Sequence, residues 1–513
     1  MADPPKSGRQ TTGQSLLEVL RHSDIINVER ARQVYCNRDL NLQDVEAIGF
    51  DMDYTLALYK QDALDRLSIQ KTLERLVTER GYPADILGIE PRPEFAIRGL
   101  VLDKHRGNIF KRDSHRHVGK VYHGFKEVTG DGLYEYRTQS MRMTTDRYAL
   151  VDTLFALPEA FLYAAIVDYW ETVSPGRNHD WKCLFHDIRY CIDLAHRDNS
   201  IKDEIIAHTD DYIERGADLA LTLHKFRSAG KKLFVVTNSY AHYTDHLMAF
   251  LLDGVLPEYP HWKNYFDIII TGSAKPHFFT DRAPFLKVAA DETILGEEHS
   301  SFDRNQVYQG GNLIDFERMS GFRGNEVIFI GDHIYGDIVR SKKSSAWRTV
   351  MIVQEMEIEL NRAEQLREET ARLDEIDMEI RRLNEEIAFD QGLAYEVDAL
   401  LGELANGGGS VATIPYDPET LKKARHELRL SRDHMRRRRL ELISRLIETE
   451  RHFDSSFNSY WGLLFKMGNK NSIFGQQVED YACLYTSRVS NFLNYSPLHY
   501  FRAPRQPMPH ERY

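Results

Sequence analysis

The chain has 513 residues, of which 42% are apolar and 28% are charged, so it falls in the globular range and has room for about three domains. Its 66 basic and 78 acidic residues give a formal net charge of −12, which opposes non-specific attraction to a phosphate backbone or an anionic membrane. We therefore expect no nucleic acid and no membrane as partners. The four cysteines show no CxxC spacing and are too few for a disulfide framework, which favours the cytoplasm.

The first residues are polar and lack the apolar core of a signal peptide. No stretch approaches the roughly 18 consecutive apolar residues that a membrane span needs. We expect a soluble chain with a flexible tail over residues 1–24.

Short apolar runs rich in Val, Ile and Phe have the pattern of buried parallel strands, and they cover residues 47–50, 233–236, 266–270, 327–330 and 349–353. Helical patterns such as residues 213–229 separate them, which predicts an α/β fold with a doubly wound parallel sheet. Three of the first four runs end at polar residues, namely Asp51, Thr237 and Asp332. Ligands of such sheets bind beyond the carboxyl ends of the strands, so these residues could converge on one crevice.

The stretch between Asp51 and Thr237 is far longer than a single crossover and must hold a second module, a cap over residues 61–214. Its first part, around residues 103–136, is mixed and has turn signals at 129–132, and helical patterns follow. These helical patterns cover residues 148–169 and 181–196. The catalytic core is then expected to comprise residues 25–60, 215–354 and 451–505.

From about residue 355 the apolar residues recur every seven positions, as in a coiled-coil-like helix, and they are Leu366, Leu373, Ile380 and Ile387, with Ile376 and Leu383 as companions. A glycine-rich turn at 406–410 and a second helical pattern over 418–450 predict an inserted antiparallel helical hairpin over residues 355–450. We interpret the run Arg436–Arg439 as a solvated helix face paired with the acidic first helix rather than as a nucleic-acid patch.

The strongest local motif is IGFDMDYT at residues 48–55, a strand that ends in the carboxylates of Asp51 and Asp53. A spacing of two points both side chains to the same side. One carboxylate could attack a phosphoryl group to form an acyl phosphate that water cleaves, and the other could move protons. Taken alone, the motif is equally compatible with a pair of capping aspartates.

Three further segments favour phosphoryl chemistry. Thr237 and Asn238 end a second strand, where a hydroxyl and an amide can bind a phosphate oxygen. Lys275 supplies a positive charge for the transferring group. Asp332 and Asp337 add two carboxylates, and magnesium prefers such oxygen ligands.

In this order, the four segments resemble motifs I to IV of the haloacid dehalogenase superfamily of phosphohydrolases. Longer segments resemble the cytosolic purine 5′-nucleotidase family, which is specific for inosine and guanosine monophosphates (IMP and GMP); they are GFDMDYTLALY (49–59), LFALPE (154–159), TNSYAHYTD (237–245), AKPHFF (274–279), IGDHIYGDIVRSKK (330–343) and FGQQVEDYACLYTSRVSNFL (474–493). The resemblance covers about residues 25–510, apart from the helical hairpin.

The resemblance implies Asp51 as nucleophile and Asp53 as general acid and base, whose main-chain carbonyl also binds Mg²⁺. It implies that Asp51 and Asp332 are the other protein ligands of Mg²⁺, and that Asp337 supports the metal site from behind these ligands or through water. The phosphate-binding positions are matched by Thr237, Asn238 and Lys275.

In the cap, the family's base-recognition stretch is matched by Arg189, Asp193, His196 and Lys202, and the position that stacks on the purine is matched by Phe155. Arg189 and Asp193 stand four residues apart on a predicted helix, where an ordinary intrahelical ion pair is the simpler interpretation. The functional interpretation is that Arg189 donates to the six-position carbonyl of the base and that Asp193 accepts from N1–H.

We therefore expect a Mg²⁺-dependent 5′-nucleotidase that hydrolyses IMP and GMP through an aspartyl-phosphate. The resemblance further implies phosphotransferase activity and a homo-oligomer, a dimer or tetramer. The alternatives are a phosphatase of another metabolite, which would make no use of Arg189 and Asp193, and an oligomeric scaffold built on the hairpin.

Many family members are activated by nucleotides such as ATP at a separate effector site. The matching positions Arg142, Lys343, Gln477 and Tyr481 are kept here, but Asp480 replaces an arginine and Asp152 replaces an asparagine. An anion in place of a cation repels a polyphosphate, so we expect weak or absent activation by ATP. The alternatives are that Lys342 and Lys343 compensate, or that the site accepts another ligand.

Overall fold

The computed structural model describes residues 28–138, 144–289, 292–405, 416–505 and 508–511. The chain divides into two compact units, one formed by residues 1–358 and 472–513 and the other by residues 359–471. The tail predicted over residues 1–24 lies outside the described residues. Within the described ranges, no helix combines the length and the apolar character that crossing a bilayer requires.

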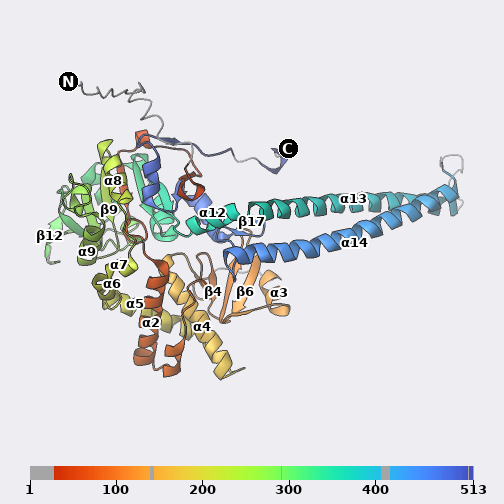
Figure 1. The fold of residues 1–513 in the computed structure, drawn as a ribbon, viewed down its shortest axis with the longest axis horizontal. Coiled ribbons are helices and arrows are strands. Elements are labelled where there is room, and N and C mark those ends of the chain that lie inside the picture. The colour runs from red at the N-terminus through yellow and green to blue at the C-terminus, as the bar shows by residue number, and fades with distance from the viewer. Residues whose placement is uncertain (1–27, 139–143, 290–291, 406–415, 506–507, 512–513) are drawn as a thin grey trace, which may run out of the picture. The chain divides into compact units, whose positions relative to one another are not determined.

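The first unit is built around a ten-stranded sheet of order β1-β18-β15-β14-β3-β9-β10-β13-β11-β12 (Figure 1). Neighbours from β18 to β13 are parallel, and the pairs at both edges are antiparallel. The strands are β1 (Tyr35–Cys36), β3 (Ala47–Phe50), β9 (Lys232–Val236), β10 (Ile268–Thr271), β11 (Phe285–Val288), β12 (Ile294–Glu298), β13 (Val307–Gly310), β14 (Val327–Gly331), β15 (Arg348–Ile352) and β18 (Leu484–Thr486). The chain runs outward from β3 in both directions, so the predicted doubly wound sheet is confirmed.

The central strands are buried on both sides, which explains why their sequences do not alternate with polar residues. At Gly49 in β3, a Cβ atom would lie 2.2 Å from the ring of Phe234 in β9. Only glycine allows this close contact. The ring of Phe234 packs in turn on Phe316 and Trp347, in the core that joins the sheet to helix α10 (Leu313–Ser320).

Other helices of this unit are α6 (Lys202–Ala207), α7 (Thr209–Tyr212), α8 (Asp218–Ser228), α9 (Ala241–Leu252), α11 (Arg340–Ser344) and α15 (Ile473–Tyr481), and strands β2 (Leu40–Asn41) and β19 (Tyr500–Phe501) form a small separate pair. The helix predicted over residues 213–229 is too long, because α8 begins at Asp218. Ile213 instead forms a bridge with Tyr59, and the Glu214 N–H donates to the Leu58 carbonyl. This extended pairing holds residues 213–214 out of the helix.

The cap combines helices with a five-stranded antiparallel sheet of order β7-β6-β5-β4-β8. Its helices are α2 (Gln61–Arg80), α3 (Asp131–Thr138), α4 (Leu157–Val173) and α5 (Trp181–Arg197), and its strands are β4 (Val101–Asp103), β5 (Asn108–Arg112), β6 (Val118–His123), β7 (Lys126–Glu127) and β8 (Tyr148–Leu150). The helix predicted over residues 148–169 is wrong at its start. Tyr148 pairs with Asp103 in the sheet, where Arg147 also binds the buried Asp103 carboxylate at 2.7 Å, so the segment enters the sheet before α4 begins.

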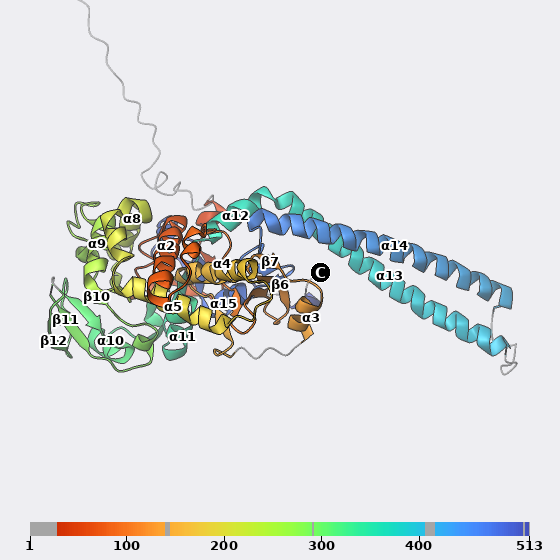
Figure 2. The same cartoon turned by 90° about the horizontal axis from the view of Figure 1, so that it is seen from below.

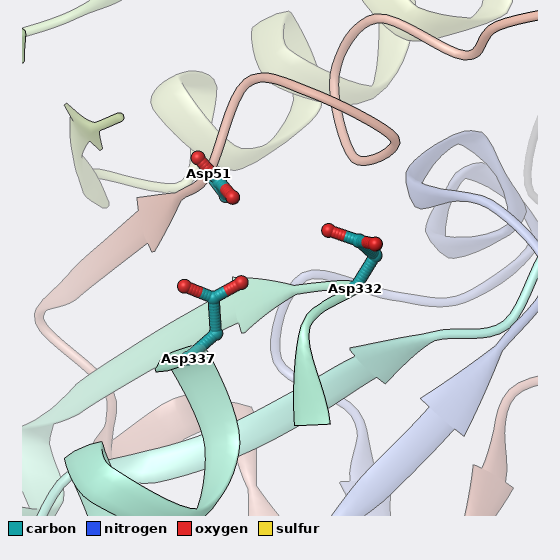
Figure 3. Close-up of side chains that lie close together, drawn as sticks. All are labelled: Asp51, Asp332 and Asp337. Carbon is teal, nitrogen blue, oxygen red and sulfur yellow. The ribbon is translucent and has the colours of Figure 1, made fainter. Parts of the chain in front are cut away.

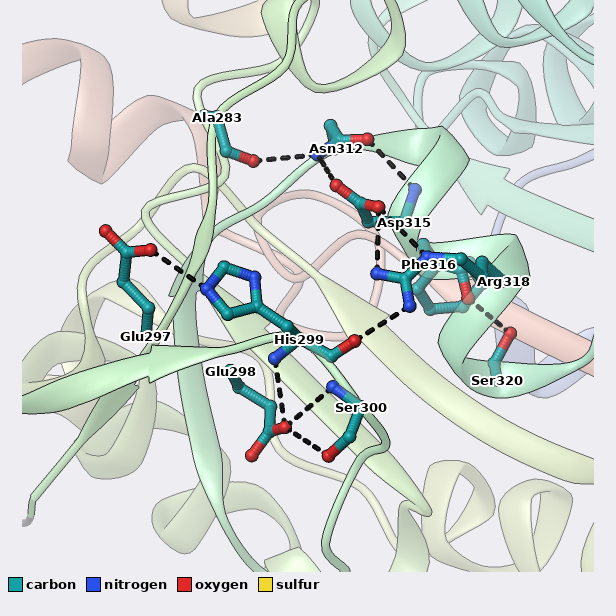
Figure 4. Close-up of polar contacts among 10 residues, drawn as sticks. All are labelled: Ala283, Glu297, Glu298, His299, Ser300, Asn312, Asp315, Phe316, Arg318 and Ser320. Carbon is teal, nitrogen blue, oxygen red and sulfur yellow. Dashed lines mark hydrogen bonds and ion pairs between the residues drawn. The ribbon is translucent and has the colours of Figure 1, made fainter.

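The far edge of the large sheet is a β-hairpin, β11–β12, that is fastened to α10 by polar contacts (Figure 4). At the end of β12, the Glu298 carboxylate accepts from the backbone N–H groups of His299 and Ser300 at 3.0 and 2.8 Å. Arg318 on α10 donates to the His299 carbonyl at 2.8 Å and to Asp315. These bonds hold the turn after an otherwise exposed edge strand.

The second unit is dominated by α13 (Arg367–Ala405) and α14 (Pro418–Phe457), preceded by α12 (Met356–Gln365), which begins in the first unit, and followed by the short pair β16 (Lys466–Met467) and β17 (Lys470–Asn471). The two long helices lie side by side (Figure 2). Arg425 pairs with Asp398 and Arg438 with Glu379, so the helices are antiparallel. The predicted hairpin is confirmed, and Arg438 pairs with the acidic helix as expected.

The predicted heptad positions are not equally buried between these two helices. Ile376, Ile380 and Leu442 form a buried cluster. Leu366 and Leu373 are only half-buried. The buried positions of α13 begin at Ile376 and continue through Ile380 and Ile387 to Ala394.

Candidate active site

The site begins where β3 and β14 end side by side at the centre of the sheet. Asp51 follows β3 directly, and its N–H donates to the Ile330 carbonyl in β14 at 2.8 Å. Asp332 follows β14. The chain departs from β3 to either side, so the two carboxylates stand at the switch point of the sheet, where ligands of doubly wound folds bind.

Asp51, Asp332 and Asp337 form a buried acidic cluster whose ligand oxygens lie within 4.8 Å of one another; Figure 3 shows the three carboxylates facing a common space. Asp337 comes from a single π-helical turn, η9 (Ile334–Val339). A Cβ atom at Gly331 would lie 2.4 Å from Asp337 Oδ2. The glycine that ends β14 is therefore required for Asp337 to enter the cluster.

Lys275 is the cation of the cluster. Its Nζ lies 2.9 Å from Asp51 Oδ1 and 2.7 Å from Asp337 Oδ1, and its side chain is 3% exposed. Burial lowers the pKa of Lys275, but the charges of Asp337 and Asp51 outweigh burial and leave the pKa above its usual value. For Asp51 the effect of burial has the opposite sign: it raises the pKa far above the usual range, and the charge of Lys275 opposes that shift. Lys275 thus favours the anionic form of Asp51.

The remaining charge of the cluster suits a divalent cation. Three carboxylates against one ammonium leave an excess of negative charge, and Asp332 Oδ2 is buried without a hydrogen-bond partner among the described residues. Burial, followed by repulsion from Asp337, raises the pKa of Asp332 to about 7. An oxygen-binding cation would satisfy this oxygen and relieve the repulsion.

Asp53 is held apart from the cluster by two hydroxyl groups. Tyr59 donates to Asp53 Oδ1 at 2.6 Å, and Ser239 donates to Oδ2 at 2.7 Å. The Tyr59 hydroxyl also lies 2.9 Å from that of Tyr243. Sequence reasoning missed these three hydroxyl residues, although all three fall inside the quoted motifs, Tyr59 in residues 49–59 and Ser239 and Tyr243 in residues 237–245.

Thr237 and Asn238 lie at the end of β9 beside Lys275. The Thr237 hydroxyl accepts from the Ser239 N–H at 3.1 Å. The Asn238 amide accepts from the Lys275 N–H at 2.6 Å and donates to the Lys275 carbonyl at 3.0 Å. Asn238 therefore fixes the backbone that carries the lysine.

A cavity of about 760 Å³ connects these strand ends to the cap. Its lining includes Asp51, Asp53, Tyr59, Thr153, Phe155, Asp193, His196, Arg197, Lys202, Asn238, Ser239, Tyr243, Asp332 and His333. Four of the five predicted base-binding residues thus share one cavity with the two predicted catalytic carboxylates. This volume is within the range of small-molecule sites.

At the cap end, Phe155 and His196 meet edge to face, with ring centroids 5.9 Å apart. Burial, followed by the charge of Lys202, lowers the pKa of His196 to about 4, so the imidazole is neutral near pH 7. Lys202 Nζ lies 5.4 Å from the ring centroid of Tyr243. This end of the cavity is therefore aromatic, with a cation beside the rings.

Arg189 is the predicted base-binding residue that does not line the cavity. Its guanidinium binds Glu159 of α4 at 2.9 Å rather than forming the ion pair with Asp193 that the spacing suggested. Glu159 is buried, which raises its pKa to about 7, and Arg189 opposes that shift. Burial also raises the pKa of Asp193, again opposed by Arg189. Arg189 thus contacts Glu159 and acts on Asp193 only through its charge, and sequence reasoning did not identify Glu159 as a partner.

The predicted effector residues are only partly described. Arg142 lies outside the described residues, as does the side chain of Lys343. Gln477, Asp480 and Tyr481 share helix α15, where Asp480 accepts from Gln476 at 2.8 Å. Asp152 instead lies 3.6 Å from His333, beside the acidic cluster.

The model of the 5′ nucleotidase family matches residues 34–513, so the chain belongs to this family. A 5′-nucleotidase domain-containing protein of Dictyostelium discoideum is 28% identical over 510 residues, which cover 97% of this chain and 78% of the relative. The 5′-nucleotidase domain-containing protein 2 of Rattus norvegicus is 27% identical, over 97% of this chain and 83% of its own length. The expectation of a phosphomonoester hydrolase is confirmed at the level of the family.

Among solved structures, one described as a predicted phosphoglycolate phosphatase from Haemophilus somnus is 12% identical, with a TM-score of 0.27 over 60% of this chain and 86% of that chain. This similarity is too low to carry an argument. The fold is established by its own strand order, and the activity class by the family.

Proposed function

We propose that this protein is a Mg²⁺-dependent 5′-nucleotidase that prefers IMP and GMP among nucleoside monophosphates. The observation that carries the proposal is the single cavity with Asp51 and Asp53 at one end and Phe155, Asp193 and His196 at the other. A nucleotide has the same two ends, a phosphate and a flat polar base. A small phosphometabolite would have no use for the aromatic end.

In this proposal, an Asp51 carboxylate oxygen attacks phosphorus and forms an aspartyl-phosphate. Lys275, at 2.9 Å from Asp51, favours the ionised nucleophile and offsets charge on the phosphoryl oxygens. Thr237 and Asn238 hold the phosphate-binding backbone at the end of β9.

Asp53 acts as the general acid and then as the general base. It gives a proton to the leaving 5′-oxygen and then takes one from the water that cleaves the acyl phosphate. Tyr59 and Ser239 each donate to one of its oxygens. They fix its orientation and stabilise the carboxylate that remains after protonation of the leaving group.

The buried carboxylates of Asp51, Asp332 and Asp337 fit a Mg²⁺ ion, with the main-chain carbonyl of Asp53 as a further ligand. When bound, Mg²⁺ supplies positive charge that stabilises the transferring phosphoryl group. The protein's own contribution is to hold these oxygens together in a buried place.

We further propose that the base stacks on Phe155 beside His196, with Asp193 accepting from N1–H and Arg189 donating to the six-position carbonyl. Adenine, with an amino group at position six and no proton on N1, would leave both groups unsatisfied. Arg189 would exchange part of its contact with Glu159 for the base. The pair Arg189–Glu159 therefore sets how readily the guanidinium reaches the substrate.

Two further parts of the proposal concern the enzyme's wider behaviour. A nucleoside can intercept the aspartyl-phosphate in place of water, which would give phosphotransferase activity. The protein is also proposed to form a homo-oligomer, a dimer or tetramer.

Phosphate release across a panel of nucleoside monophosphates, with Mg²⁺ and with excess chelator, tests the proposal. We expect Mg²⁺-dependent release that is fastest with IMP and GMP. Equal rates for all bases would contradict the base assignment, whereas release only from non-nucleotide phosphates would favour the other phosphatase alternative. Absence of any phosphatase activity would favour the scaffold.

A further inference from the structure

The cap contains a buried arginine that the proposed mechanism does not use. Arg98 precedes β4 and is 1% exposed. Its Nη1 donates to the main-chain carbonyl of Asp332 at 2.8 Å, and its Nε and Nη2 donate to the two Glu355 oxygens at 2.7 and 2.5 Å. One rigid guanidinium thus joins the cap to the segment that carries a carboxylate of the acidic cluster.

The surroundings of Arg98 leave it little freedom. Its guanidinium lies over the ring of Phe474, 4.8 Å from the centroid. Gly99 has φ +87°, and a Cβ atom there would lie 2.7 Å from Phe474 Cβ. The Gly99 N–H also donates to the Val151 carbonyl at 2.7 Å. Gly99 therefore allows Phe474 to pack closely over the Arg98 guanidinium and hold it in place.

The direction of the Asp332 carboxylate depends on its main chain. Within the described part of the chain, Asp332 Oδ2 is buried without a hydrogen-bond partner, and burial alone would not set its direction. Arg98 instead holds the main-chain carbonyl of Asp332. The guanidinium is planar, and its N–H donors keep fixed directions relative to one another. The two hydrogen bonds from Nε and Nη2 to Glu355 therefore determine where Nη1 points.

We propose that Arg98 is a positioning residue for the metal site, through which the cap orients Asp332. Arg98 touches neither the substrate nor the metal in this proposal. It fixes the Asp332 main chain, and with it the carboxylate, while its charge offsets part of the repulsion within the cluster. This inference rests on the proposed Mg²⁺ site and adds that the site is complete only with the cap in place.

The test measures Mn²⁺ binding without substrate, from the loss of the free-ion electron paramagnetic resonance signal. Arg98→Met should weaken binding roughly ten- to a hundredfold, as is typical when a partner of a metal ligand is removed. Arg147→Met is the matched control, because it also separates a cap arginine from a buried carboxylate, that of Asp103, at a distance from the acidic cluster. Its Mn²⁺ dissociation constant should change less than about twofold.

Arg98→Met leaves Glu355 unpaired and could unfold the cap, so a second variant separates folding from positioning. In Arg98→Met/Glu355→Met both partners are apolar, which restores packing without an unpaired charge. We expect its melting temperature to recover relative to the single variant while Mn²⁺ binding stays weak. The Mg²⁺ concentration for half-maximal activity should rise by the same factor, with the IMP to AMP preference unchanged.

Two results would overturn the inference. If the double variant binds Mn²⁺ as tightly as the wild type, Arg98 does not position the site. If the control Arg147→Met weakens binding as much as Arg98→Met, the effect is general damage to the cap. Failure of the wild type to bind Mn²⁺ would instead overturn the metal site itself, and with it this inference.

Discussion

The two ends of the cavity are built differently. At the phosphate end, Asp51, Lys275 and Asp332 are almost completely buried, and each stands at or just beyond a strand end. At the cap end, where the base is proposed to bind, Asp193 is exposed, and the side chain of Arg189, which does not line the cavity, is 47% exposed. The phosphate end is thus enclosed by the sheet, whereas Asp193 and Arg189 are open to solvent. In the proposed function, catalysis takes place at the buried end and selection among bases at the exposed one.

The largest expected effect is at the phosphate end. Asp51→Asn should abolish turnover, because it removes the attacking charge without changing side-chain size. Activity assays should show no hydrolysis above background, and calorimetry should show that IMP still binds. Near-normal activity would place the nucleophile elsewhere. A phosphorylated protein trapped in the wild type and absent from this variant would identify the covalent step.

Asp53→Asn should be the next most severe change. Loss of positioned proton transfer typically costs about a hundred- to ten-thousandfold in rate. Ser239→Ala is the graded comparison, since it removes only one of the two hydroxyl donors to Asp53, and we expect a smaller loss in kcat. A loss in Ser239→Ala equal to that in Asp53→Asn would mean that the hydroxyl does more than orient the carboxylate.

At the base end we expect a change of preference rather than a loss of activity. The wild type should favour IMP over AMP by at least roughly tenfold in kcat/KM, which corresponds to about 1.4 kcal/mol. Arg189→Ala should shrink this ratio. Lys182→Ala, also on α5 and paired with Asp146, should leave it unchanged. Equal use of AMP and IMP by the wild type would refute the assignment of Arg189 and Asp193.

The base end should also respond to acid through His196, whose pKa of about 4 lies below the usual 6.5. Between pH 6.5 and pH 4, His196 binds a proton in the unfolded chain but stays neutral in the folded protein. The stability that neutral His196 contributes above pH 6.5 is therefore lost as the pH falls toward 4. At pH 5 the loss is about 2 kcal/mol. The melting temperature of His196→Phe should therefore fall less than that of the wild type when the pH is lowered from 7.5 to 5. His186→Phe, exposed on the same helix, should behave as the wild type.

The smallest expected effect is that of ATP. With Asp480 at the effector position, and with Asp152 beside His333, millimolar ATP should raise activity at subsaturating IMP by less than about twofold, because an added anion repels the polyphosphate. A several-fold rise would show that the acidic substitutions leave the site open. Asp480→Arg should otherwise create or strengthen the response.

The amino-acid sequence by itself was enough to predict which strands end in the candidate catalytic residues. Buried parallel strands appear in the sequence as continuous apolar runs, and such strands end at one edge of a sheet, so the pattern alone places Asp51, Thr237 and Asp332 together. The same kind of local signal, heptad spacing, predicts the hairpin. The predicted boundaries around residues 148 and 213 were wrong, because β8 and the Tyr59–Ile213 bridge depend on partners distant in sequence.

Only the tertiary structure decided which groups surround these carboxylates. Tyr59 and Ser239 come from different segments, and both donate to Asp53. Arg189 binds Glu159 in place of its expected partner, Asp193. Arg98 contacts Asp332, which lies 234 positions further along the chain. No local spacing encodes such contacts. They arise because buried donors, acceptors and charges must find partners wherever packing brings the chain together.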